Sequence, residues 1–190
     1  MDPKKTAILD AAKKSFSLFG YKGTTMGHIA KIAGVGKGTL YLYVTSKEEL
    51  LNEIVSVLVE DMKRTAEEAI GQGATVFEKI HGAIYAALMF RKEQELLIKL
   101  AHEVNEFGSQ VTENALDQIE NQMVDYISQL IERAVSTGGM KPCDPKITAF
   151  IVYKLYLALV YDWERQHPPL TDERILELLQ TYLMNGLSTK

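Results

Sequence analysis

Cysteine and long hydrophobic runs are scarce in this chain of 190 residues, which has a single cysteine, Cys143. One cysteine cannot form an internal disulfide, so the sequence suits a reducing compartment. Charged residues interrupt each apolar stretch before the roughly 18 to 20 residues that a membrane span needs. The amino end does not begin the apolar block of a signal peptide. We therefore expect a cytoplasmic protein that has no membrane partner.

Proline and glycine are also few, with five and thirteen residues, and this excludes collagen-like and low-complexity chains. Apolar residues recur at intervals of three and four, without the alternation of strands, so we expect an all-α fold. Capping residues and glycine stops divide the chain into about nine helices. These expected helices cover about residues 3–19, 26–33, 37–43, 47–70, 76–88, 93–107, 116–134, 145–166 and 172–185.

Basic residues are slightly fewer than acidic ones, 21 against 25, and the formal net charge is −4. This net charge by itself disfavours a nucleic-acid partner. The charge is uneven, however, because the first 47 residues carry a net +6 and the remaining residues a net −10. A basic head on an acidic body is typical of a small DNA-binding module joined to a second domain.

Two short expected helices joined by a glycine turn, over residues 25–44, have the layout of a helix-turn-helix. If Leu40 points inward, a helical period of about 100° per residue puts Gly38 and Leu42 on the opposite face. Thr39 and Tyr41 lie on the flanks. A glycine permits close approach to a DNA groove, a leucine suits a thymine methyl, and hydroxyls suit phosphates or base edges. The second helix is therefore a candidate recognition helix.

Three further residues near this helix are candidate phosphate contacts. Lys37 and Lys47 each stand at the amino end of an expected helix, where their charge adds to the helix dipole at a phosphate. Tyr43 lies about 60° from Leu40 on the helical wheel. Its ring is a candidate for inward packing with the hydroxyl directed at a phosphate, and an ordinary core aromatic is the alternative.

Residues 8–50 resemble the amino-terminal domain of the TetR family of bacterial transcriptional regulators. The motifs that carry the resemblance are A-A-x-x-x-F-x-x-x-G-Y-x-x-T-T, I-A-x-x-A-G-V and G-T-L-Y-x-Y-V-x-x-K-E-x-L, within about a quarter of the chain. The resemblance implies a DNA-binding domain at residues 1–47 and a helical ligand-binding and dimerisation domain at residues 48–190. The DNA-binding residues that it implies are Thr25, Lys37, Gly38, Thr39, Tyr41, Leu42, Tyr43 and Lys47.

In the remaining helices, aromatic, methionine and polar residues have two interpretations, as core residues or as the lining of a ligand pocket. Lys154 stands on an otherwise apolar helix and needs a partner, either a carboxylate such as Glu103 or an acidic ligand. The candidate ligand-binding residues are His81, Tyr85, Met89, His102, Glu103, Phe107, Met123, Tyr126, Lys154 and Tyr156.

The helix expected over residues 145–166 is apolar nearly all round, so it needs cover on two sides. The remaining helices do not suffice to cover both it and the last helix. We therefore expect a homodimer in which these two helices and their symmetry mates form a four-helix interface. The candidate interface residues are Phe150, Leu157, Tyr161, Ile175, Leu179 and Tyr182.

Patterns typical of catalytic or metal sites are incomplete. Glu78 and His81 form one E-x-x-H, but a di-iron bundle needs a second. His102 and Glu106 share a helix face, but a zinc-protease helix has a histidine in place of Glu106. We therefore expect no enzyme activity, no catalytic residue, no metal and no cofactor. A helical-bundle metal-dependent enzyme and a helical protein–protein adaptor are the alternatives.

Together these features predict a ligand-responsive DNA-binding transcriptional regulator. We expect a homodimeric repressor that binds double-stranded DNA at an inverted-repeat operator. An apolar or amphipathic small-molecule effector is expected to release it from that operator.

Overall fold

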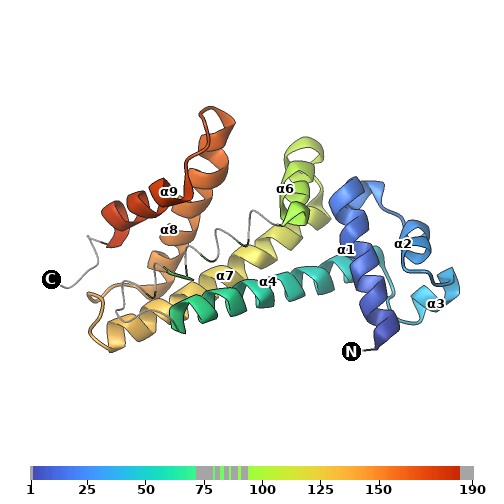
Figure 1. Cartoon of the computed structure of the whole chain (residues 1–190), viewed down its shortest axis with the longest axis horizontal. Coiled ribbons are helices and arrows are strands. Elements are labelled where there is room, and N and C mark those ends of the chain that lie inside the picture. Colours follow the sequence, from blue (N-terminus) through green and yellow to red (C-terminus); the bar gives the residue numbers. More distant parts are fainter. Residues whose placement is uncertain are drawn as a thin grey trace. The chain divides into compact units, whose positions relative to one another are not determined.

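The computed structural model describes residues 2–71 and 94–184, together with residues 79, 82, 83, 86 and 90 (Figure 1). This part of the chain forms eight α-helices and no strand, which confirms the all-α fold. The helices are α1 (Pro3–Gly23), α2 (Met26–Ile32), α3 (Lys37–Tyr41), α4 (Lys47–Gly71), α6 (Glu95–Phe107), α7 (Gln110–Ser136), α8 (Pro145–Leu157) and α9 (Asp172–Leu179). Short π and 3-10 turns follow α8 and α9, at Ala158–Asp162, Trp163–Arg165 and Gln180–Met184. The helix expected over 76–88 falls mostly outside the described residues.

The helices group into two compact units. Unit 1 comprises Met1–Glu60 and Arg91–Ile119, and unit 2 comprises Asp61–Phe90 and Glu120–Lys190. This grouping does not follow the expected boundary at residue 47, because α6 packs on α1. The assignment of DNA binding to residues 1–47, and of ligand binding and dimerisation to residues 48–190, stays a prediction. No helix in the described ranges is both long and apolar enough to cross a membrane.

α1 begins as the sequence predicts and extends one turn beyond the predicted end. Asp2 is its N-cap and accepts a hydrogen bond from the backbone N–H of Lys4 at 2.8 Å. Gly20 interrupts the helix with φ 73° and ψ 172°, a conformation that only glycine adopts readily. Helical spacing predicts that Phe19 shares the apolar stripe of Ile8 and Phe16, but its side chain is 57% exposed and its ring centre lies 6.5 Å from that of His28.

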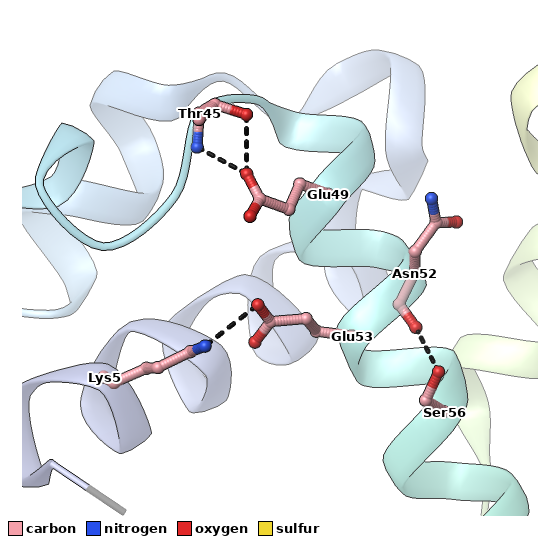
Figure 2. A network of polar contacts seen from close by, with 6 residues as sticks. All are labelled: Lys5, Thr45, Glu49, Asn52, Glu53 and Ser56. Atoms are coloured by element: carbon pink, nitrogen blue, oxygen red, sulfur yellow. Dashed lines mark hydrogen bonds and ion pairs between the residues drawn. The ribbon is translucent and has the colours of Figure 1, made fainter.

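α4 begins with a polar network (Figure 2). Ser46 caps the helix by accepting a hydrogen bond from the backbone N–H of Glu49 at 3.0 Å, as its capping-box pattern predicts. The Glu49 carboxylate accepts hydrogen bonds from the hydroxyl and the backbone N–H of Thr45, both at 2.6 Å, one residue earlier than in the usual box. These hydrogen bonds lower the pKa of Glu49. Farther along α4, Glu53 pairs with Lys5 of α1 at 3.0 Å and so ties the two helices together.

α8 and α9 pack on each other within one protomer. Ile175 and Leu179 of α9 are each 2% exposed. They pack against Leu155 and Leu159, at the end of α8 and in the turn that follows it. The apolar stripe of α9 thus covers the protomer's own helix, and the assignment of Ile175 and Leu179 to the dimer interface stays a prediction.

The other expected interface residues differ in exposure. Phe150 and Tyr182 are 47% and 71% exposed, whereas Leu157 is half-buried. The side chain of Tyr161 lies outside the described residues. The free apolar surface of this region therefore includes the face of α8 that carries Phe150.

Candidate nucleic-acid interface

α2 and α3 form a helix-turn-helix whose second helix is fixed by one buried residue. The turn between them contains Gly34, whose positive φ of 68° favours glycine. Leu40 of α3 is fully buried. On the opposite face Leu42 is 83% exposed, and a Cβ on Gly38 would meet no atom within 4 Å. The structure thus confirms the orientation of α3 that the helical period predicts.

The other candidate DNA-contacting residues of α2 and α3 differ in exposure. Thr25 caps α2 by accepting a hydrogen bond from the backbone N–H of His28 at 3.2 Å, and its side chain is exposed. Lys37 is exposed, Tyr41 is 45% exposed, and Thr39 is half-buried. Contact between these residues and DNA stays a prediction.

Tyr43 is held by the start of α1. Its side chain is half-buried, and its hydroxyl donates a hydrogen bond to Asp2 Oδ2 at 3.0 Å. This bond raises the pKa of Tyr43. The pKa of Asp2 is lowered, first by the backbone N–H of Lys4 and then by the Tyr43 hydroxyl. A phosphate that binds the Tyr43 hydroxyl would therefore compete with Asp2.

Lys47 makes its contacts within the protein. Its Nζ donates hydrogen bonds to the carbonyl oxygens of Tyr21 and Thr24 at 2.7 and 2.8 Å, and lies 4.2 Å from the centre of the Tyr21 ring. Burial lowers the pKa of Lys47. Backbone carbonyls at the end of α1 thus take two of the three ammonium protons of Lys47, which leaves one for a phosphate. The expected phosphate contact of Lys47 stays a prediction.

Comparison with known proteins identifies what kind of protein carries this helix-turn-helix. Residues 8–54 match the model of bacterial regulatory proteins of the tetR family. The HTH-type transcriptional regulator YhgD of Bacillus subtilis (strain 168) is 46% identical over 185 residues, which cover 97% of each chain. The chain belongs to the TetR family. It is a DNA-binding transcriptional regulator, and α2 and α3 are its helix-turn-helix.

Solved structures of TetR-family proteins share the fold along nearly the whole chain. A TetR-family regulator from Rhodococcus sp. superposes with a TM-score of 0.78 at 18% identity, covering 100% of both chains. AibR, in complex with isovaleryl coenzyme A and operator DNA, gives a TM-score of 0.63 at 24% identity, covering 94% of this chain and 97% of AibR. The all-α fold expected from the sequence is therefore the TetR fold.

The candidate ligand-binding residues of this TetR-family regulator are divided between the two units and a segment outside the described residues. The candidates that lie outside the described residues are His81, Tyr85 and Met89. Those on α6, which belongs to unit 1, are His102, Glu103 and Phe107. Those of α7 and α8, which lie in unit 2, are Met123, Tyr126, Lys154 and Tyr156.

Lys154 has a carboxylate partner that the sequence did not indicate. Its Nζ donates a hydrogen bond to Glu120 Oε2 of α7 at 2.6 Å, and its side chain is 46% exposed. Glu103 accepts its hydrogen bond from α1, so Lys154 pairs with Glu120 in place of the expected Glu103. Because Lys154 is partly solvated and paired, it does not require an acidic ligand.

Tyr126 of α7 is a buried polar residue whose hydroxyl makes no hydrogen bond within the described part of the chain. Burial and then the charge of Glu67 raise its pKa to about 12. Tyr126 lines a cavity of about 300 Å³ together with charged and amide groups, among them Glu67, Gln122 and Arg133. This lining is more polar than the aromatic pocket that the sequence led us to expect.

Metal ligands are not gathered anywhere in the described ranges, where no group of three or more His, Cys, Asp or Glu side chains could hold an ion. His102 Nδ1 lies 3.2 Å from Glu106 Oε2 in an exposed pair on α6. This pair lies on the helix surface, with no third ligand among the described residues.

Replacing Lys47 should affect stability, and replacing Lys37 should affect DNA binding. Lys47→Met keeps the aliphatic stem but leaves two carbonyls without their charged donor, so we expect a loss of about 1.5 to 3 kcal/mol in the free energy of unfolding. Lys37→Met is the matched control, because its exposed ammonium should matter only for DNA. We expect it to leave the melting temperature unchanged and to weaken binding to all duplexes, with a shallower salt dependence. Urea unfolding and fluorescence anisotropy measure the two effects, and the reverse pattern would contradict the assignment.

Proposed function

We propose that this TetR-family protein is a homodimeric repressor that binds an inverted-repeat operator through α3 and is released from it by an amphipathic small molecule. The observation that carries the proposal is the exposed face of α3, with Gly38 and Leu42 outward and Leu40 fully buried behind them. A helix of five residues reaches few base pairs, so one copy gives little specificity. Two copies related by a twofold axis read two half-sites, and the operator is then an inverted repeat.

Gly38→Ala should separate DNA binding from folding. In the free protein the added methyl group meets open space, and alanine favours a helix over glycine by up to about 1 kcal/mol, so the melting temperature should hold or rise. Against the groove the methyl group would be overpacked, and we expect operator binding to weaken by roughly 1 to 3 kcal/mol. The probe is the duplex that the wild-type protein selects from a random-sequence library, which should be an inverted repeat.

Two results of this experiment would contradict the proposed docking face. One is wild-type affinity of Gly38→Ala for the selected duplex, and the other is a selected sequence without twofold symmetry. Leu40→Ala serves as the contrasting variant. It should lose about 2 to 5 kcal/mol of stability because it opens a cavity in the core, and it should weaken DNA binding only through unfolding.

Dimerisation is supported by apolar surface that one protomer leaves exposed. Ile147, Phe150 and Ile151 of α8 are 59%, 47% and 48% exposed, and Tyr182 after α9 is 71% exposed. Phe150 and Ile151 stand three and four positions after Ile147, so the three share one face of α8, and an exposed apolar face of this kind marks an interaction site. Its position on the helices that the sequence assigns to the interface supports a second copy of the chain as the occupant.

Charged substitutions should separate the interface from the core of unit 2. Phe150→Asp and Tyr182→Asp place a charge on exposed positions, so we expect folded monomers in sedimentation velocity. Leu179→Asp places a charge among buried leucines and should yield unfolded or insoluble protein. Dimers of both exposed-site variants that are as stable as wild type would place the interface elsewhere.

The effector is proposed to be amphipathic because unit 2 combines a buried apolar core with an unsatisfied polar group. Met123 and Tyr126 of α7 are both buried, and the Tyr126 hydroxyl, which has no hydrogen-bond partner among the described residues, suits a polar atom of a ligand. AibR, which shares the fold, forms a complex with isovaleryl coenzyme A, an acyl chain on a polar carrier. A molecule of that class is the first probe to use.

Isovaleryl coenzyme A should bind the free dimer more tightly than the operator-bound dimer. Coupling between sites is typically about 1 to 3 kcal/mol, so we expect each ligand to weaken the other by roughly five- to 150-fold. Calorimetric titration of the protein with and without the selected duplex measures the factor in one direction, and anisotropy with and without the thioester measures it in the other. Tight binding with equal affinity for both forms would eliminate release by this molecule, and coenzyme A alone is the control for its polar half.

A further inference from the structure

The end of α1 forms a hook, residues 20–24, that other helices hold in place. Within the hook the Thr24 hydroxyl donates a hydrogen bond to the carbonyl oxygen of Gly20 at 2.8 Å and lies 3.0 Å from the hydroxyl of Ser15. Ser15 and Thr24 are almost fully buried. The hook joins α1 to the start of α2, so its geometry bears on where the helix-turn-helix sits.

Glu103 of α6 binds this hook directly. Its Oε1 accepts a hydrogen bond from the backbone N–H of Lys22 at 3.1 Å, and the residue is only 5% exposed. A Cβ on Gly20 would lie 2.0 Å from the same Oε1. Position 20 therefore requires glycine for two reasons, its positive φ and the close approach of the Glu103 carboxylate. A second contact joins the same elements, because Lys22 Nζ donates to the carbonyl oxygen of Phe107 at 3.3 Å.

Lys47 of α4 holds the hook from another helix. Its ammonium binds the carbonyl oxygens of Tyr21 and Thr24, and the negative charge of Glu103 acts on it against the effect of burial. A carboxylate from α6 and an ammonium from α4 thus both bind backbone groups of the hook. Each offsets part of the desolvation of the other.

The two oxygens of the Glu103 carboxylate differ in their hydrogen bonding. Glu103 Oε2 is buried and has no hydrogen-bond partner within the described residues. Burying a carboxylate that has a partner for only one oxygen costs free energy, and the Lys22 N–H and the charge of Lys47 offset part of that cost. A small shift of α6 can therefore change this balance.

We propose that Glu103 is the positioning residue through which α6 holds the helix-turn-helix in the geometry that binds the operator. The proposal rests on the operator binding proposed above, and it assigns the regulation of that site to one carboxylate. When α6 is in place, Glu103 fixes the backbone of the hook, and with it the ends of α1 and α4 that meet there. A shift of α6 withdraws the carboxylate and leaves the hook and the Lys47 ammonium without their partner.

Glu103→Gln tests this proposal with little change in shape. The amide keeps an acceptor for the Lys22 N–H but removes the negative charge. We expect affinity for the selected duplex to fall about tenfold, within the usual range of coupling between sites, while affinity for unrelated duplexes stays as in wild type. Glu106→Gln is the matched control on α6, because Glu106 is exposed and pairs with His102, and it should bind like wild type. Affinity of Glu103→Gln within twofold of wild type, or above it, would overturn the proposal.

Hydrogen exchange in the wild-type protein provides a second test that does not depend on the folding of a variant. If the Glu103 contact favours operator binding, then by linkage the operator must favour the contact. The amide of Lys22 should therefore exchange several-fold more slowly when the selected duplex is bound, even though Lys22 lies outside α3. Unchanged exchange at Lys22 would overturn the proposal. If the wild-type protein selected no duplex at all, the proposed repressor function would fail first, so the two failures are distinguishable.

Discussion

The DNA-binding surface depends on the burial of Leu40. α3 has five residues, far fewer than the roughly 12 to 15 that an isolated helix needs in water, so its own hydrogen bonds cannot hold it. Burying one leucine contributes about 1.5 to 3 kcal/mol, and Val44, which follows α3, is buried with it. Gly38 and Leu42 can face outward only because these residues fix the opposite side of the helix. α1, α2 and the start of α4 contribute the rest of this core, through Ile8, Phe16, Ile29 and Leu50.

The features that could be predicted from the sequence are those in which partners lie a few residues apart. Thr25, Ser46 and Asp144 each cap a helix by accepting a hydrogen bond from the backbone N–H three residues later. The sequence also orients α3 correctly, because the helical period relates Leu40 to its near neighbours. The contacts that were missed join distant positions: Lys154 binds a residue 34 positions away, and Glu103 one that is 81 positions away. A charged residue in a sequence shows that a partner is needed, but only the fold determines which partner comes within reach.

The packing partner of an apolar helix face is likewise not indicated by the sequence. The sequence predicts the apolar stripe of α9. Such a stripe indicates that one face of the helix is buried, but it does not indicate which element buries it. In the fold, Ile175 and Leu179 are covered by the end of α8 in the same protomer. The exposed apolar side chains are elsewhere, on the early turns of α8 and at Tyr182. A helix that is apolar nearly all round, as α8 is, can pack on its own chain with one face and still offer another to a second copy.

The positive charge of the basic head, residues 1–47, is also shared between contacts within the protein and solvent. The net +6 of the first 47 residues counts every lysine equally, yet several of them make contacts inside unit 1. Lys5 is paired with Glu53, which lies outside those 47 residues and cancels its charge. Lys47 and Lys22 direct their ammonium groups to backbone carbonyls. Glu53 therefore cancels one positive charge of the head, while Lys47 and Lys22 keep their charge but have fewer ammonium protons for phosphates. The fit of α3 in the groove then gains weight relative to charge. A regulator of this kind can be switched by a small displacement of its helices, since a change in fit alters the affinity without any change in charge.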